Sequence, residues 1–143
     1  MTTFASSKNT YLASFLTDWV TDPQGVRASF ISLIEKLAAK AGVSFDFKAR
    51  PGVSYSLRAT CQGFSARPLF AIIDVVDDPE ARWLSVCFYE DMVSDPDELG
   101  NMIPQGILGE DGHCFDVFEK DDALLAYLDQ RISEAHRHAA STT

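Results

Sequence analysis

The sequence lacks the short motifs that mark the common enzyme classes. No lysine follows a glycine, which excludes a phosphate-binding loop ending in Gly-Lys, and no G-x-S-x-G, H-E-x-x-H or C-x-x-C is present. Three glycines at a spacing of three, Gly106, Gly109 and Gly112, do not fit the dinucleotide-binding pattern G-x-G-x-x-G either. Nucleoside-triphosphate chemistry and the familiar hydrolases therefore have no direct support, and we expect no cofactor.

Long apolar runs are also missing. No stretch approaches the roughly 20 apolar residues that a membrane-spanning helix requires. The first residues, MTTFASSKNT, have neither the basic start nor the apolar centre of a signal peptide. We therefore expect a soluble, cytoplasmic protein without a membrane partner.

Cysteine is scarce and odd in number. Cys61, Cys87 and Cys114 lie far apart in the sequence, each in an apolar, strand-like context. This pattern favours buried, reduced thiols over a framework of disulfides. A chain of 143 residues with 46% hydrophobic residues is long enough to fold around an ordinary core without such cross-links.

Positive charge is sparse in the middle of the chain. Twelve lysines and arginines face 21 acidic residues, for a net charge of -9, and residues 74–122 hold fifteen of the acidic residues but only two basic ones. An acidic field of this kind repels the phosphates of nucleic acids and anionic membrane surfaces. We expect neither as a partner.

Apolar residues recur at helical spacing in three segments. The spacing predicts a short helix over residues 11–20 and a longer one from Pro23 to Ala41, with Gly42 as its left-handed end. A last helix is expected to begin after a capping aspartate, Asp121 or Asp122.

Between the second and the last helix the apolar pattern changes to a period of two, which is typical of strands. The segments concerned are residues 43–47, 53–61, 69–76, 83–89 and 113–118. The fold class that we predict is α+β: an antiparallel sheet of four to five strands in sequence order, with two main helices packed on one face and a short N-terminal helix. One domain is expected over residues 11–138, with flexible ends at 1–10 and 139–143.

The segment from 90 to 112 is read as a long acidic loop. Asp95, Asp97 and Gly100 occupy the first, third and sixth positions of a calcium-binding loop. The twelfth position, where that loop needs a glutamate, is Gly106. No metal site is therefore predicted.

His113 is the only histidine outside the C-terminal tail. In a strand, its side chain and that of Cys114 point to opposite faces, so the two do not converge on one site. Glu110 or Asp111 could orient the imidazole for use as a general base or ligand. The alternative is a histidine at the mouth of a turn, without a chemical role.

Four basic residues follow one another without an intervening acid between positions 48 and 73: Lys48, Arg50, Arg58 and Arg67. Arg50, Arg58 and Arg67 are candidates for binding a small anionic ligand, because a guanidinium group offers paired N–H donors. The alternative is that these residues pair with acidic residues of the same chain or of a second subunit.

Aromatic residues of the strands, Tyr55, Trp83, Phe88 and Tyr89, either line an apolar pocket or belong to a core or interface. Two functions of different class remain open. The first is a non-enzymatic binding or protein-interaction module that forms homo-oligomers. The second is a small enzyme or anionic-ligand binder whose cleft lies between the 90–112 loop and the sheet, with His113 as acid and base.

Overall fold

The structure is a computed structural model that describes residues 10–61, 67 and 69–141. The helices are α1 (Thr10–Asp18), α2 (Val26–Ala38) and α3 (Asp122–Ser141), and a short 3-10 turn, η3, spans Glu90–Met92. The strands are β1 (Val43–Arg50), β2 (Ser54–Cys61), β3 (Leu69–Val76), β4 (Trp83–Tyr89), β5 (Asn101–Ile107) and β6 (Glu110–Val117).

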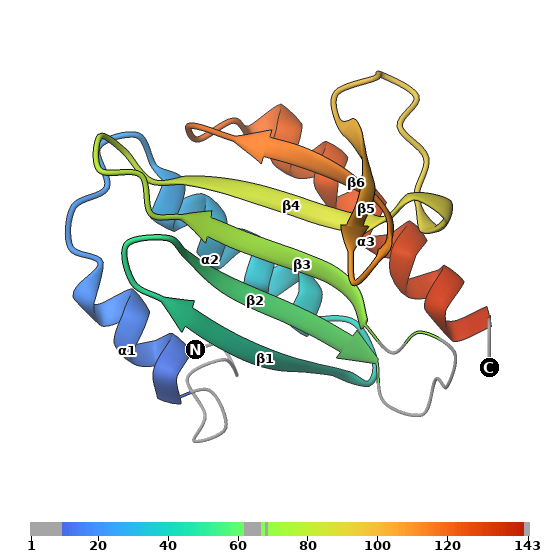
Figure 1. The fold of residues 1–143 in the computed structure, drawn as a ribbon, viewed down its shortest axis with the longest axis horizontal. Coiled ribbons are helices and arrows are strands. Elements are labelled where there is room, and N and C mark those ends of the chain that lie inside the picture. Colours follow the sequence, from blue (N-terminus) through green and yellow to red (C-terminus); the bar gives the residue numbers. More distant parts are fainter. Residues whose placement is uncertain (1–9, 62–66, 68, 142–143) are drawn as a thin grey trace.

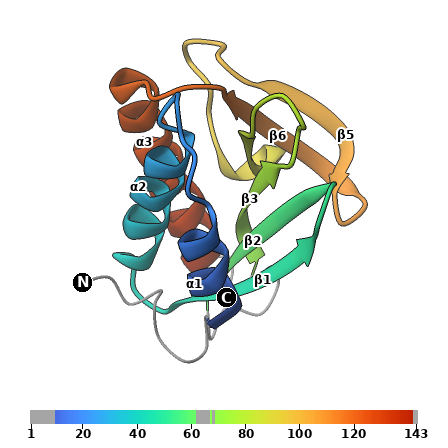
Figure 2. The same ribbon diagram turned by 90° about the vertical axis from the view of Figure 1, so that its left-hand side faces the viewer.

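Within the described residues, the six strands form one antiparallel sheet in the order β1-β2-β3-β4-β6-β5 (Figure 1). The three helices lie on one side of this sheet, with α1 beside the edge strand β1 (Figure 2). No helix in this part of the chain is both long and apolar enough to span a membrane.

The predicted α+β class and the antiparallel sheet are confirmed, but the strand number and order differ. The sheet has six strands rather than four to five, because part of the predicted 90–112 loop forms β5. The order is not sequential, since β6 pairs with β4 and β5 is displaced to the edge. An edge strand tolerates Pro104 and a break in register. Because of both features, β5 does not show the alternation of apolar and polar residues by which a strand is predicted from the sequence.

The second helix is shorter at both ends than the sequence predicts. It begins at Val26 rather than Pro23, because Gly25 has a left-handed backbone with φ of 79°. The side chain of Asp22 accepts hydrogen bonds from the first amides of the helix, those of Arg27 at 3.0 Å and Ala28 at 3.2 Å. An acidic side chain thus caps the free N–H groups, as expected at a helix start.

The last helix follows Asp121, whose carboxylate accepts a hydrogen bond from the Leu124 amide at 3.1 Å. The helix runs to Ser141, beyond residue 138 where the sequence places the end of the domain. The flexible N-terminal segment that the sequence predicts lies outside the described residues, except for Thr10, which begins α1.

The core lies between the helices and the sheet. Its largest fully buried side chains come from α1, from α2 and from every strand except β1, and include Leu12, Phe30, Leu33, Leu57, Ile73, Phe88, Ile107 and Phe115. Leu128 and Ile132 of α3 are also fully buried. The two main helices therefore both use their apolar stripes against the sheet.

Cys87 and Cys114 form a disulfide across the neighbouring strands β4 and β6. The expectation of three reduced thiols is therefore wrong for these two, and only Cys61 is a free, buried thiol. The two cysteines lie 27 positions apart in sequence, but the register of β4 with β6 sets them directly opposite one another with their Cα atoms 4.1 Å apart. Sequence distance did not reveal this pairing.

Candidate functional site

His113 lies on β6 and is held between two carboxylates. Its Nδ1 is 2.6 Å from Oε2 of Glu90, and its Nε2 is 2.8 Å from Oδ2 of Asp95. Burial would lower the pKa of His113, but the hydrogen bonds to Asp95 and Glu90, together with their charges, raise it above its ordinary value. The ring is therefore stabilised as an imidazolium that donates from both nitrogens.

This geometry differs from the arrangement that the sequence predicts. The carboxylates on the ring are Glu90 and Asp95 rather than Glu110 or Asp111. Glu110 instead forms an ion pair with Arg67, and Asp111 accepts a hydrogen bond from the Gln105 amide at 3.0 Å. An imidazolium whose two N–H groups are both bonded has no lone pair with which to take a proton.

Asp95 is the centre of this cluster. Its two carboxylate oxygens accept hydrogen bonds from the amides of Leu99 at 3.0 Å and Gly100 at 2.9 Å, and from the hydroxyl of Tyr127 at 2.5 Å. Burial would raise the pKa of Asp95, but the bonds from Tyr127, His113 and the two amides hold it well below its usual range. One carboxylate thus connects the turn after η3 to β6 and α3.

A second contact fastens the same segment to α3. Glu134 accepts hydrogen bonds from the amide of Ser94 at 3.0 Å and from its hydroxyl at 2.6 Å. Arg131 pairs with Glu134 at 2.9 Å and stacks over the ring of Tyr127, 4.4 Å from its centroid. The polar residues around His113 therefore act together as an anchor for residues 90–100.

The three arginines predicted to bind an anionic ligand, Arg50, Arg58 and Arg67, do not form one site. Arg67 bonds Asp91 at 2.5 Å and Glu110, and its guanidinium lies 4.3 Å from the centroid of the Tyr89 ring. Its donors are thus used by acidic residues of the same chain. Arg50 lies at the opposite end of the strands, since it pairs with the start of β2 while Arg67 comes just before β3.

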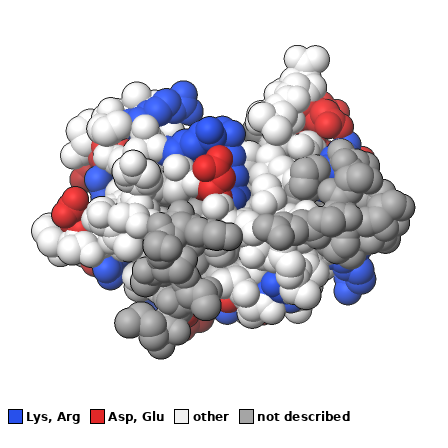
Figure 3. Space-filling view, turned by 90° about the horizontal axis from the view of Figure 1, so that it is seen from below, with Lys and Arg blue, Asp and Glu red and all other residues white. Residues whose placement is uncertain are grey.

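Arg58 occupies the middle of β2, opposite Asp46 of β1. Its Nε is buried and has no hydrogen-bond partner among the described residues. In Figure 3, Lys and Arg side chains lie in several separate groups, with Asp and Glu beside some of them. The structure therefore does not gather the three arginines on one ligand.

A cavity of about 450 Å³ lies where α1 meets β1 and β2. Most of its walls are aromatic, and we call it the aromatic pocket; these side chains are Tyr11, Phe15, Trp19, Phe47 and Tyr55. The ring of Phe15 lies 4.3 Å from that of Tyr55 and 5.4 Å from that of Phe47, centroid to centroid. Ala49 and two charged residues, Asp18 and Arg82, complete the lining.

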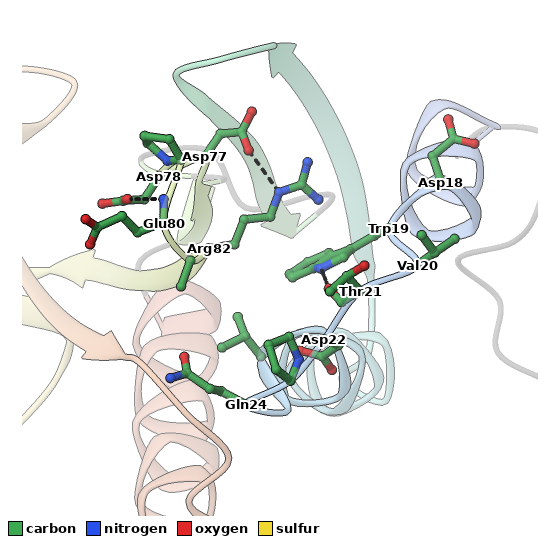
Figure 4. A pocket seen from close by; sticks show the side chains of 14 residues that line it. Asp18, Trp19, Val20, Thr21, Asp22, Gln24, Asp77, Asp78, Glu80 and Arg82 are labelled. Carbon is green, nitrogen blue, oxygen red and sulfur yellow. Dashed lines mark hydrogen bonds and ion pairs between the residues drawn. The ribbon is translucent and has the colours of Figure 1, made fainter.

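Arg82 is fixed at the wall of the aromatic pocket. Its Nε donates to Asp77 at 2.9 Å, and its guanidinium carbon lies 5.1, 4.9 and 5.3 Å from the centroids of Phe15, Trp19 and Tyr55. The bond from Arg82 holds the pKa of Asp77 below its ordinary value, so this carboxylate stays charged. The two terminal nitrogens of Arg82 point away from Asp77 (Figure 4). They have no hydrogen-bond partner among the described residues.

A neighbouring cavity of about 390 Å³ lies between the α1–α2 connection and the β3–β4 turn (Figure 4). It shares Asp18, Trp19 and Arg82 with the aromatic pocket. Three of its carboxylates already serve the fold: Asp22 caps α2, Asp77 pairs with Arg82, and Asp78 accepts the Glu80 amide at 2.9 Å. Trp19 is the only aromatic residue among the described residues that line this second cavity, so it lacks the aromatic walls of the aromatic pocket.

Sequence reasoning named only Tyr55 among the residues of the aromatic pocket. Phe15 and Trp19 were not proposed as pocket residues because apolar residues at helical spacing are expected to face the core. Phe47 was not proposed because apolar residues that alternate along a strand are expected to face the core as well. Arg82 carried a usable signal, since it is one of only two basic residues in the acidic stretch 74–122.

No family model, no curated protein and no solved structure matches this chain.

Proposed function

We propose that this protein is a non-enzymatic binding module and that the aromatic pocket is its binding site. The observation that carries the proposal is a cavity of about 450 Å³ with aromatic walls and one fixed, partly unbonded guanidinium. Small-molecule sites have this composition: mostly apolar and aromatic walls with a few oriented polar groups, at volumes of roughly 300–1,000 Å³.

The alternative of an enzyme that uses His113 as acid and base has weaker support. Both ring nitrogens are bonded to carboxylates, and His113 lines neither of the two cavities described above. A general base needs a free lone pair within reach of a substrate. The surroundings of His113 favour an anchoring role instead.

Tryptophan fluorescence provides a direct test of the binding site. The chain has two tryptophans, so Trp83→Phe leaves Trp19, in the pocket wall, as the only one. We expect aromatic fragments such as naphthalene derivatives to change the emission of Trp19 in a saturable way. Ala49→Phe, which fills the pocket, should abolish the change, and Val53→Phe, an exposed site at the β1–β2 turn, should leave it intact.

Two results would refute the proposal. One is the absence of saturable binding for every fragment in a chemically diverse set that covers neutral, anionic and cationic aromatic compounds. The other is binding that Ala49→Phe leaves unchanged, because the ligand would then occupy another part of the surface.

A second candidate function, homo-oligomerisation, is favoured by the exposed apolar side chains of the β5 region. Met102, Ile103 and Leu108 are 47%, 41% and 67% exposed, and β5 is the last strand of the sheet. An edge strand has free backbone N–H and C=O groups that a second copy can pair with around a two-fold axis. Sedimentation at high protein concentration tests this: Ile103→Lys should favour the monomer, whereas Val20→Lys, at an exposed position just after α1, should not.

A further inference from the structure

The charged groups of the aromatic pocket restrict which ligands it can hold. Arg82 supplies the terminal N–H groups that face away from Asp77, and Asp18 supplies the only carboxylate among the residues that line the pocket. A guanidinium fixed at Nε keeps its plane and its position, so little conformational freedom is lost when a ligand bonds its remaining donors.

The free edge of Arg82 matches a carboxylate. Two parallel N–H groups of a guanidinium bond both oxygens of a carboxylate, which gives strong, directional, charge-assisted hydrogen bonds. The guanidinium also lies over Phe15, Trp19 and Tyr55, and this apolar floor limits the competition from water. The same site would reject a cationic ligand, because Arg82 already occupies the face of these rings.

The charges around the pocket limit how much negative charge a ligand can carry. Asp77 offsets part of the charge of Arg82, and Asp18 adds a second negative charge to the pocket. These three side chains sum to one negative charge, so each further negative charge on a ligand adds repulsion, and a dianion such as a phosphate monoester is disfavoured more than a monoanion. A monoanionic carboxylate needs only the one guanidinium.

We propose that the aromatic pocket binds aromatic carboxylates, with the ring system between Phe47, Tyr55 and Tyr11 and the carboxylate on Arg82, which makes Arg82 the specificity-determining residue. This inference rests on the proposed function and names its ligand class. A volume of about 450 Å³ accommodates a fused two-ring system with one carboxylate.

Three naphthalene probes of nearly equal shape test the inference: the neutral naphthamide, the anionic naphthoate and the cationic naphthylmethylamine. Binding is measured by the fluorescence of Trp19 in the Trp83→Phe background. Naphthoate is expected to bind about tenfold more tightly than naphthamide, which corresponds to one charge-assisted hydrogen-bonded contact. The amine is expected to bind most weakly.

Variants then assign the preference to a residue. Arg82→Met should remove the preference for naphthoate over naphthamide, and Arg82→Lys, which keeps the charge without the planar fork, should reduce it. Arg67→Met changes the net charge by the same amount away from the pocket and should retain the full preference. If Arg82→Met fails to fold, as judged by circular dichroism, Arg82→Lys and the salt dependence of naphthoate binding provide the same comparison.

The outcomes separate the two proposals. Equal affinity for naphthoate and naphthamide overturns the carboxylate inference but leaves the binding module in place. A preference that persists in Arg82→Met overturns the role of Arg82. If none of the three probes binds, the carboxylate inference fails, and failure across the wider fragment set then refutes the binding module as well.

Discussion

Nε2 of His113 and Oδ2 of Asp95 lie 2.8 Å apart, and this pair joins the strand β6 to the segment that precedes β5. Both side chains are nearly buried, with 13% and 10% of their surfaces exposed. A charged pair so enclosed contributes to stability only while both partners are present and ionised, because either charge alone would be left without its counterpart.

Asp95→Asn is expected to lower the free energy of unfolding by about 2 kcal/mol, because it removes the charge opposite His113 and one acceptor of the surrounding hydrogen bonds. Urea unfolding followed by circular dichroism measures the change. Asp97→Asn provides the control, since it removes the same charge from an exposed side chain two positions away. Equal effects of the two substitutions would contradict the central role of Asp95.

The stability should depend on pH in two windows. The pKa of His113 is raised, so its contribution is complete below about pH 6.5, the ordinary value for histidine, and is lost as the pH rises through the raised value. The pKa of Asp95 is lowered, so its contribution is complete above about pH 4 and is lost as the pH falls through the lowered value. Unfolding free energies measured between about pH 4 and pH 9 should therefore be highest below neutrality.

His113→Gln should remove the decline on the alkaline side. His136→Gln is the matched control, because the ring of His136 bonds a backbone carbonyl, that of Ala41 at 2.9 Å, rather than a carboxylate, and packs edge-on against Phe70. An alkaline decline that survives in His113→Gln would show that another group causes it.

Gly100→Ala should destabilise the protein by about 2 kcal/mol through overpacking. A Cβ at this position would lie 2.8 Å from the carbonyl oxygen of Cys114 and 2.8 Å from the ring of Phe115. Gly109→Ala meets open space but has φ of 84°, so its cost should be near 1 kcal/mol. A thermal unfolding series that ranks Gly109→Ala as the more harmful of the two would contradict the close approach at Gly100.

The disulfide predicts a specific thiol count. Denatured protein without reductant should show one reactive thiol, that of Cys61, and three after reduction. In the folded state even Cys61 should react slowly, since burial raises the pKa of its thiol. Reduction, or the double substitution Cys87→Ser with Cys114→Ser, should lower the free energy of unfolding by about 3 kcal/mol for a loop of this length.

The same count bears on the cytoplasmic location that the sequence predicts. Cytosolic reductants keep thiols reduced, so acid quenching of whole cells followed by alkylation under denaturing conditions should trap three free thiols if the location is cytoplasmic. One free thiol trapped in this way would place the protein in an oxidising compartment.

Most of the helices and central strands could be predicted from the sequence because their side chains face the core. The stripe of α2 and the run of β3 follow directly from the burial of one or both faces, as Phe30 and Ile73 illustrate. The strand β5 could not be predicted, because nearly all of its residues are exposed and no alternation remains. The alternation of apolar and polar residues arises because one face of a strand is buried, so a strand that is exposed on both faces does not show it.

The candidate sites were harder to predict because they depend on pairs distant in sequence. His113 could be singled out from its position, but Glu90 and Asp95 are 23 and 18 positions away and become neighbours only through the pairing of β4 with β6. Likewise, Arg82 meets Phe15 only after the helix α1 has packed beside the sheet. The spacing of residues within one helix or strand does not indicate which residues of other elements they contact.

The bond between Cys87 and Cys114 turns the intervening chain, which includes η3 and β5, into a closed covalent ring. A protease that cuts this ring once, for example beside the exposed Leu108, opens it without separating the two products. The nicked molecule would keep its full mass on a non-reducing gel and divide into two fragments only after reduction. The most exposed edge of the sheet can therefore be cleaved while the N-terminal and C-terminal parts remain one molecule.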